Sequence, residues 1–154
     1  MDAHDLRILC AIQHDASASL ADLSVQVNLS SNAVWKRLRR LEAAGFVARR
    51  VAILDRRKVG LPVTVFVSVK TDQHNGQWAD DFAAAVREIA EVVEFYRMAG
   101  EVDYLLKIVC ADIDDYDRIY RKIIAAVPLR DVSASFAMEQ LKYTTELPLE
   151  TLFR

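Results

Sequence analysis

The side chains best suited to chemistry in this sequence are a run of cations between residues 30 and 45. Lys36, Arg37, Arg39 and Arg40 stand there against a single acid, Glu42. Lysine and arginine donate hydrogen bonds to phosphate oxygens, whereas an ordinary surface helix intersperses both signs of charge. The run therefore predicts a surface that lies against the phosphates of a nucleic acid.

Metal and nucleophilic chemistry have weaker candidates. Cys10 and His14 are four residues apart, a spacing that would suit two ligands of a zinc site or a nucleophile with its base. No second Cys/His pair supplies the other two zinc ligands. A cation loop is resembled by Asp112, Asp114, Asp115 and Asp117, yet the glycine and the distal glutamate of a calcium loop are missing. The spacing of Asp112 and Asp115 fits a helix N-cap instead. We expect no metal, no cofactor and no catalytic residue.

The cations lie on a predicted helix that Ser30 caps and Gly45 ends. Val34, Leu38 and Leu41 follow the spacing of one buried face. At about 100° per residue, four polar residues fall on the opposite face, with Arg37 beside them: Asn32, Lys36, Arg39 and Arg40.

Two shorter helices precede the basic one. Asp2 caps the first, with Asp5 in its first turn, and Ser19 with Asp22 opens a second helix that runs through Val27. Two helices joined by a tight turn, the second rich in cations, form a helix-turn-helix pattern. Residues 46–54 alternate loosely, which predicts a strand or a two-stranded wing.

In this pattern the early residues of the last helix reach base edges and the flanking cations hold phosphates. The predicted DNA-contacting residues are Ser30, Ser31, Asn32, Trp35, Lys36, Arg37, Arg39, Arg40, Arg49 and Arg50. Of these, Ser31, Asn32, Trp35 and Lys36 fall where base contacts occur. Two alternatives stay open, since helix-turn-helix geometry also occurs in proteins that never touch DNA, and Trp35 could simply cover the edge of the core.

The second half of the sequence shows a different pattern. Its predicted elements are a strand over Val63–Val69, a helix from Trp78 to about Ala90, two β-rich runs over Val92–Ala99 and Tyr104–Ala111, a helix over Tyr116–Val127 and a strand over Val132–Lys142. This βαββαβ order predicts an α+β, ferredoxin-like sheet with both helices on one face. The other face, which Phe66 and Phe136 indicate to be partly apolar, needs a cover, and we expect a second copy of the chain to supply it.

Charge divides the sequence at the same place. Residues 1–58 hold ten Lys/Arg and six Asp/Glu, whereas residues 59–154 hold ten and sixteen. We predict a winged helix-turn-helix domain with its linker strand over residues 1–58, and a second domain with a different role over residues 59–154. The composition, 53% hydrophobic and 27% charged, is that of a globular protein. With two cysteines and no long apolar run, we expect a cytoplasmic protein associated with the nucleoid when bound to DNA, and no membrane partner.

Taken together, these residues resemble the Lrp/AsnC (feast/famine) family of transcriptional regulators over essentially the full length. The carrying segments are residues 5–9, 28–30, 37–42 with Gly45-Phe46, 99–107, and the strand that contains Met138, Glu139 and Lys142. The resemblance implies a winged helix-turn-helix followed, over residues 59–154, by the effector-binding and oligomerisation domain often called RAM. It also implies dimers that assemble further, commonly into octamers, and double-stranded DNA as a partner.

The same resemblance implies a small amino acid as effector, held in a cleft where effector domains meet. The implied effector-binding residues are Met98, Ala99, Gly100, Glu101, Asp103, Tyr104, Ser133 and Ser135. Glu101 or Asp103 would face the α-amino group, and the two serines would come from a neighbouring subunit. Residues 35–38, 95–101 and 135–145 are similar to the DecR-like, cysteine-responsive subgroup, which suggests L-cysteine. The alternatives are an amino-acid-binding scaffold that does not bind DNA, and a ferredoxin-like enzyme using Glu101 and Asp103.

Overall fold

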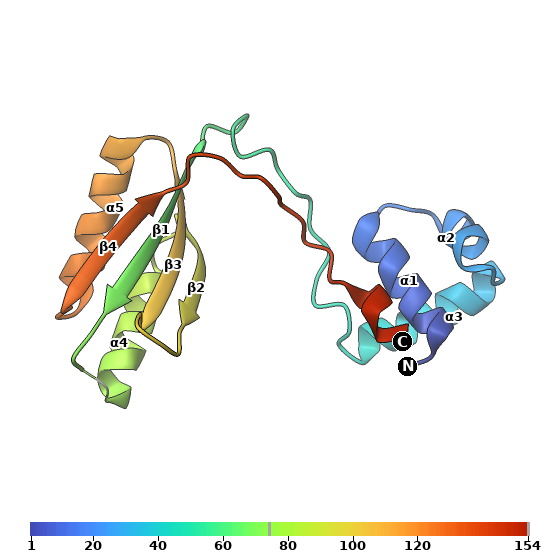
Figure 1. Ribbon diagram of the computed structural model, residues 1–154. Helices are drawn as coiled ribbons and strands as arrows, with labels where there is room; N and C mark the ends of the chain where they lie inside the picture. Colours follow the sequence, from blue (N-terminus) through green and yellow to red (C-terminus); the bar gives the residue numbers. More distant parts are fainter. Residues whose placement is uncertain (74, 154) are drawn as a thin grey trace. The chain divides into compact units, whose positions relative to one another are not determined.

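Two units make up the fold in the computed structural model, which describes residues 1–73 and 75–153. The first unit contains residues 1–53 together with the C-terminal segment from Lys142, and the second contains Leu54–Leu141. The elements of the chain (Figure 1) are α1 (Ala3–His14), α2 (Leu20–Val27), α3 (Ser31–Ala43), β1 (Val63–Lys70), α4 (Gly76–Arg87), β2 (Val92–Arg97), β3 (Tyr104–Cys110), α5 (Ile113–Ala126), β4 (Asp131–Phe136) and the 3-10 helix η1 (Leu149–Phe153).

The helices of the first unit begin at the predicted caps. The Asp2 carboxylate accepts from the Asp5 N–H while the Asp5 carboxylate accepts from the Asp2 N–H, and Ser19 with Asp22 forms the same reciprocal box at α2. The Ser30 hydroxyl accepts from the Ala33 N–H at the start of α3. Between the helices lies a core of eight buried side chains: Ile8, Leu9, Ile12, Leu23, Val27, Val34, Leu38 and Leu41.

Gly45 ends α3 as the sequence predicts. Its φ is +79°, and its N–H donates to the Glu42 carbonyl while the Phe46 N–H donates to the Leu41 carbonyl, both at 3.0 Å. These two bonds satisfy carbonyls that would otherwise be left unpaired at the end of the helix.

The predicted strand over residues 46–54 is wrong, because the structure gives this segment no β-bridge. A strand needs a neighbour for its N–H and C=O groups. None of the strands pairs with this segment within the described residues, and the side chains of Val51, Ile53 and Leu54 are 57%, 57% and 70% exposed. The segment is an irregular linker.

The C-terminal segment packs with the first unit, whereas the sequence pattern assigns it to the second domain. The Gln13 side chain donates to the Leu147 carbonyl and accepts from the Leu147 N–H, each at 3.0 Å. His14 Nδ1 lies 2.9 Å from Glu146 Oε1, and Leu149 packs against the core of the first unit. Nothing in the local sequence around residue 147 signals a partner 134 positions away.

The second unit is built on a four-stranded antiparallel sheet in the order β2-β3-β1-β4. Figure 1 shows α4 and α5 on one face of this sheet. Val65, Val67 and Val69 of β1 point to that face and are fully buried, together with Phe82 of α4 and Ile119 of α5. This arrangement confirms the predicted ferredoxin-like architecture.

β4 is shorter than predicted, since it stops at Phe136 rather than Lys142. Its neighbour β1 begins at Val63, directly after Pro62, which has no N–H to donate. The last bond in this ladder runs from the Ala137 N–H to the Thr64 carbonyl. Beyond that point β4 has no strand to pair with.

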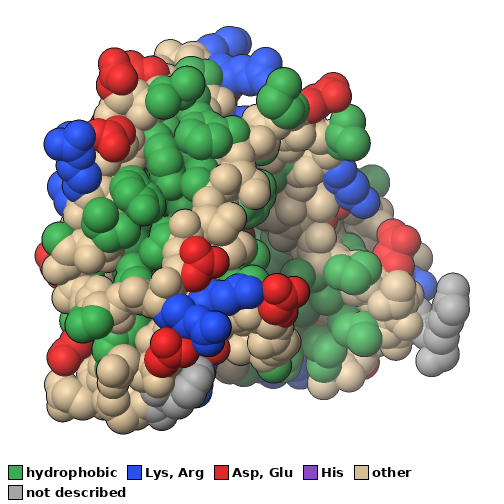
Figure 2. Space-filling model, turned by 60° about the vertical axis from the view of Figure 1, so that its left-hand side comes forward, with side chains coloured by type: hydrophobic (Ala, Val, Ile, Leu, Met, Phe, Trp, Pro, Cys, Tyr) green, Lys and Arg blue, Asp and Glu red, His purple; other side chains and the backbone are tan. Residues whose placement is uncertain are grey.

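The other face of the sheet is left without a helix. Phe66 points to it and is 39% exposed, and its cross-strand neighbour on β4 is Ser135. Phe136 pairs with the buried Val65 and stacks edge-on against Tyr116 of α5, so it belongs to the helix side, contrary to the expectation. Figure 2 shows hydrophobic side chains gathered over an extended part of the surface.

Candidate functional site

The outer face of α3 presents polar and cationic groups, as the sequence predicts. Ser31, Asn32 and Lys36 are exposed. The Arg39 guanidinium lies 6.0 Å from the centre of the Trp35 ring, and Trp35 is 47% exposed. This cation–π contact holds an arginine on the surface of the helix.

Arg37 and Arg40 are arranged differently from the other cations of α3. Arg37 Nη1 lies 2.7 Å from carboxylate oxygens of both Asp2 and Asp5, and Arg40 Nη2 lies 2.6 Å from Asp5. Burial favours the neutral form of Asp5, but hydrogen bonds from the Asp2 N–H and Arg37 keep its pKa below the usual value. Asp5 is therefore ionised at neutral pH and binds α3 to α1.

Arg39 and Arg50 both lie beside Glu42, close to the end of α3. Arg50 Nη2 is 2.8 Å from Glu42 Oε1, and Arg39 Nη1 is 3.8 Å from the other oxygen of the same carboxylate. The side chain of Arg50 is 45% exposed, and Arg49 is exposed. Glu42 thus keeps Arg50 next to α3, while much of that guanidinium remains accessible.

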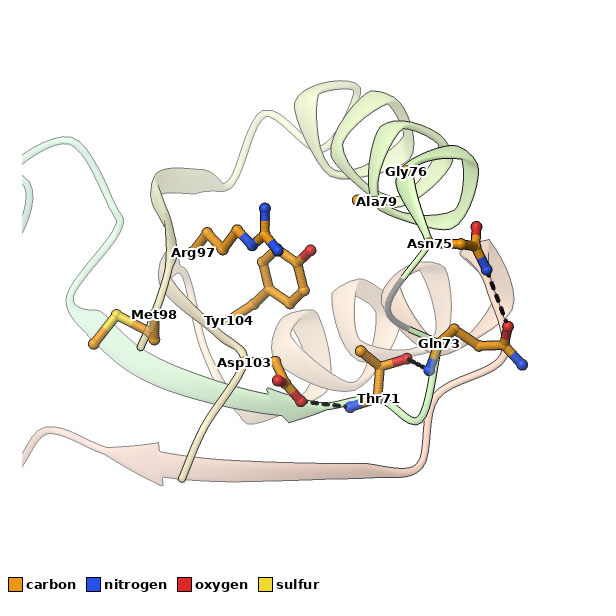
Figure 3. Close-up of a pocket in the computed structure, with 9 residues that line it drawn as sticks. All are labelled: Thr71, Gln73, Asn75, Gly76, Ala79, Arg97, Met98, Asp103 and Tyr104. Atoms are coloured by element: carbon orange, nitrogen blue, oxygen red, sulfur yellow. Dashed lines mark hydrogen bonds between the residues drawn. The ribbon is translucent and has the colours of Figure 1, made fainter. Parts of the chain in front are cut away.

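A cavity of about 230 Å³ opens at one end of the sheet in the second unit (Figure 3). Its residues come from the end of β2, the start of β3, the loop after β1 and the first turn of α4. They are Thr71, Gln73, Asn75, Gly76, Ala79, Arg97, Met98, Asp103 and Tyr104.

Asp103 is fixed in this cavity by its backbone and its side chain. Its carboxylate accepts from the Thr71 N–H at 2.8 Å, its N–H donates to the Val69 carbonyl and its carbonyl accepts from the Met98 N–H. The Thr71 hydroxyl in turn accepts from the Gln73 N–H at 3.0 Å. These bonds hold the loop after β1 against the turn between β2 and β3.

An aromatic cluster supports the floor of the cavity. The Tyr104 ring packs against Phe82, Phe95 and Trp78 with centroids 5.3, 5.6 and 5.8 Å away. Figure 3 shows Arg97 extending into the space towards α4, whereas Met98 extends away from it. The cavity therefore combines a cation, an anion and an aromatic floor, which together suit a small molecule that carries both charges.

The predicted effector-binding residues divide between this cavity and other places. Met98, Asp103 and Tyr104 line it. Glu101 instead pairs with Lys70 at 2.9 Å, its side chain is 88% exposed, and the bond from Lys70 lowers its pKa. Ala99 and Gly100 are exposed in the turn, where the φ of Gly100, +139°, excludes most other residues.

Ser133 and Ser135 lie away from the cavity, on the face of the sheet that no helix covers, opposite Ser68 and Phe66 of β1. The cavity residues that the sequence did not indicate are Thr71, Gln73, Asn75, Gly76, Ala79 and Arg97. The segment Asp72–Gly76 reads only as a polar loop. Arg97 lies within residues 95–101, which resemble the subgroup, but the resemblance does not mark it as an effector-binding residue.

Residues 1–73 and 75–153 hold no group of three His, Cys, Asp or Glu side chains that could bind a metal ion. In the same part of the chain, every helix is too short or too polar to cross a bilayer.

Two family models match the chain: the Lrp/AsnC ligand binding domain over residues 64–147, and a winged helix-turn-helix DNA-binding model over residues 1–48. The chain belongs to the Lrp/AsnC family. This confirms the resemblance and the fold class predicted from the sequence. As an Lrp/AsnC protein it is a transcriptional regulator with a helix-turn-helix and an amino-acid-binding domain, and not an enzyme.

Individual Lrp/AsnC proteins are similar over nearly the whole length. A glutamate uptake regulatory protein of Zymomonas mobilis is 50% identical, with 97% of this chain and 91% of that protein covered. The DNA-binding transcriptional activator DecR of Escherichia coli is 46% identical, with 97% and 99% covered. The structure of a Neisseria meningitidis regulator in complex with L-Met superposes with a TM-score of 0.93, at 31% identity and 99% coverage of both chains.

Proposed function

We propose that this regulator is a cytoplasmic homodimer, assembling further into octamers, that binds specific DNA sequences through α3 and responds to L-cysteine bound in the cavity of the second unit. The observation that carries the effector part is that one small cavity is lined by both a cation, Arg97, and an anion, Asp103. Opposite charges held apart on a rigid frame match the carboxylate and ammonium groups of a free amino acid.

In this proposal Asp103 accepts hydrogen bonds from the α-ammonium group, since Thr71 holds its carboxylate in place. Arg97 and the first turn of α4 face the α-carboxylate, because a helix N-terminus and a guanidinium both favour an anion. Tyr104 supplies the floor against which a short side chain packs. Glu101 is a poorer candidate for the ammonium group because Lys70 already pairs with it.

L-cysteine is the proposed effector because the sequence is similar to the cysteine-responsive subgroup and because DecR is 46% identical. Two other amino acids are alternative candidate effectors, because relatives carry them in their names: L-glutamate for the Zymomonas protein and L-methionine for the Neisseria complex. Calorimetric titration of the purified protein with all three tests the assignment. Saturable binding of L-cysteine in preference to the others supports it, whereas no L-cysteine binding alongside clear binding of another amino acid overturns it.

The DNA part of the proposal places α3 in the major groove. Ser31, Asn32 and Lys36 are exposed on the outer face, and Asn32 is the residue with the side-chain amide that reads adenine best. We propose that the exposed side chains of Arg39, Arg40, Arg49 and Arg50 bind phosphates. A dimer presents two such helices to two half-sites.

The dimer is proposed to form on the face of the sheet that has no helix. Phe66 is 39% exposed there and Tyr96 is 50% exposed. Ser133 and Ser135 lie on the same face and would reach a neighbouring subunit. For the effector to regulate, it must bind one arrangement of the subunits more tightly than another, and a coupling of about 1–3 kcal/mol is typical.

A further inference from the structure

Two arginines of α3 donate hydrogen bonds to acids at the start of α1. Arg37 Nη1 lies 2.7 Å from Asp5 Oδ1 and 2.7 Å from Asp2 Oδ2, and Arg40 Nη2 lies 2.6 Å from Asp5 Oδ2. Asp5 thus binds the two arginines through separate oxygens. It is 1% exposed, so its charge is enclosed by these partners.

The spacing of the four residues fixes one helix against the other. Asp2 and Asp5 are three apart at the start of α1, and Arg37 and Arg40 are three apart in α3, so each pair lies on one face of its helix segment. Apolar contacts between the helices are non-directional, whereas charge-assisted hydrogen bonds prefer one geometry. Attachment at two points therefore restricts the rotation of α3 about its own axis, which decides which side chains face outwards.

Arg37 is poorly placed to bind a phosphate. Its side chain is 26% exposed, against 69% for Arg39. A phosphate that approached Arg37 would meet the negative charges of Asp2 and Asp5. It would also have to draw the guanidinium away from Asp5 and leave a buried carboxylate with fewer partners, which is strongly unfavourable.

We infer that Asp5 and Arg37 are positioning residues, which orient the DNA-contacting face of α3 through α1, and that Arg37 makes no phosphate contact. The inference rests on the proposed binding of DNA by α3. The predicted phosphate contacts of this helix are then only Arg39 and Arg40, whose side chains are more exposed. One guanidinium nitrogen of Arg40 also bonds to Asp5.

The salt dependence of DNA binding tests the inference with a matched pair of variants, Arg37→Gln and Arg39→Gln. Each phosphate contact contributes about 0.9 to the slope of log K against log salt concentration. Arg39→Gln should lower the slope by about that amount. Arg37→Gln should leave the slope unchanged and reduce the ratio of affinities for specific and scrambled DNA by about tenfold or more, the effect of losing one base contact. A slope lowered equally in both variants would overturn the inference.

Asp5→Asn separates positioning from simple charge. Removing an acid beside a DNA-binding helix should tighten binding to every sequence if charge alone matters. The inference predicts the opposite for specific DNA, with the affinity ratio lowered by about tenfold or more. Tighter specific binding by Asp5→Asn would contradict it.

If circular dichroism shows that Asp5→Asn does not fold, Asp2→Asn replaces it. Asparagine still caps a helix, but it removes one of the two carboxylates that hold Arg37. A lowered affinity ratio supports positioning, and an unchanged or raised ratio contradicts it. Wild-type protein that shows no salt-dependent DNA binding would overturn the proposed function as well, so the two failures are distinguishable.

Discussion

Replacing Asp103 by asparagine removes one negative charge from the cavity and changes little else. The Asp103 carboxylate accepts from the Thr71 N–H at 2.8 Å, and the amide oxygen of asparagine accepts the same bond. The backbone bonds of residue 103 to Val69 and Met98 do not involve the side chain. We therefore expect the Asp103→Asn variant to fold normally with an intact cavity.

The expected loss of affinity follows from the kind of bond that is removed. A hydrogen bond to a charged group contributes about 1.5–3 kcal/mol, which corresponds to about 10- to 150-fold in a dissociation constant. The cavity is open and Asp103 is only half-buried, so solvent screens the charge and the lower end applies. We predict that Asp103→Asn binds L-cysteine about 10-fold more weakly than the wild type.

Calorimetric titration measures this change, with Glu101→Gln as the matched control. Glu101 lies two residues away and undergoes the same exchange of carboxylate for amide, but it pairs with Lys70 outside the cavity. Its substitution should leave the affinity unchanged. Loss of affinity in Glu101→Gln, with none in Asp103→Asn, would refute the assignment of the ammonium site.

A ligand without the amino group distinguishes a lost contact from a damaged cavity. 3-Mercaptopropionate retains the thiol and the carboxylate of cysteine and lacks the ammonium. If Asp103 recognises the ammonium, Asp103→Asn should bind this analogue no more weakly than the wild type does. An equal loss of affinity for L-cysteine and for the analogue would mean that the substitution acts on the fold of the cavity.

Three further predictions concern stability and assembly. The Asp5 N–H and Arg37 lower the pKa of Asp2 from 3.8 to about 2, so Asp2 stabilises the fold above about pH 4 and loses this effect as the pH falls through about 2. The difference in urea midpoint between wild type and Asp2→Asn should therefore be full at pH 7 and much smaller at pH 2. Gln13→Ala removes both bonds to Leu147, so hydrogen exchange of the Leu147 amide should accelerate, whereas Gln140→Ala should not change it. Phe66→Asp places a charge in the proposed dimer face and should raise the dimer dissociation constant by at least about tenfold in sedimentation. Ile113→Asp is the control and should leave the constant unchanged, because Ile113 is exposed on α5, which covers the opposite face of the sheet.

Local features of the fold could be predicted from the sequence because their causes lie within a few residues. Asp2, Ser19 and Ser30 cap helices by bonds that span three positions, and Gly45 ends α3 through its own positive φ. The alternation of valines in β1 predicted its buried face because side chains of a strand point to opposite sides in turn.

Features that depend on distant partners could not be predicted in the same way. The alternating pattern of residues 46–54 resembles a strand, but a strand also needs a neighbour, which the pattern does not reveal. Arg37 and Arg39 belong to the same cationic run, and the sequence does not distinguish them. Only the packing of α1 against α3 shows that Asp2 and Asp5 bind Arg37.

The candidate cavity shows the same division. The family resemblance predicts Met98, Asp103 and Tyr104 as effector-binding residues because they lie in one continuous segment that matches the family. Thr71 and Asn75 come from a loop that sequence pattern alone marks only as polar, and they join the cavity because antiparallel pairing of β1 with β3 brings that loop beside the turn before Tyr104.

The most direct test of the account is a fluorescence-anisotropy titration of DNA from the region upstream of the protein's own gene, with a scrambled duplex as control. The titration is run at two salt concentrations, with and without L-cysteine, L-glutamate or L-methionine. We predict salt-dependent binding that prefers the upstream DNA and that shifts about 5- to 150-fold with L-cysteine. Equal binding of both duplexes, or affinity for upstream DNA that L-cysteine leaves unchanged, would contradict it.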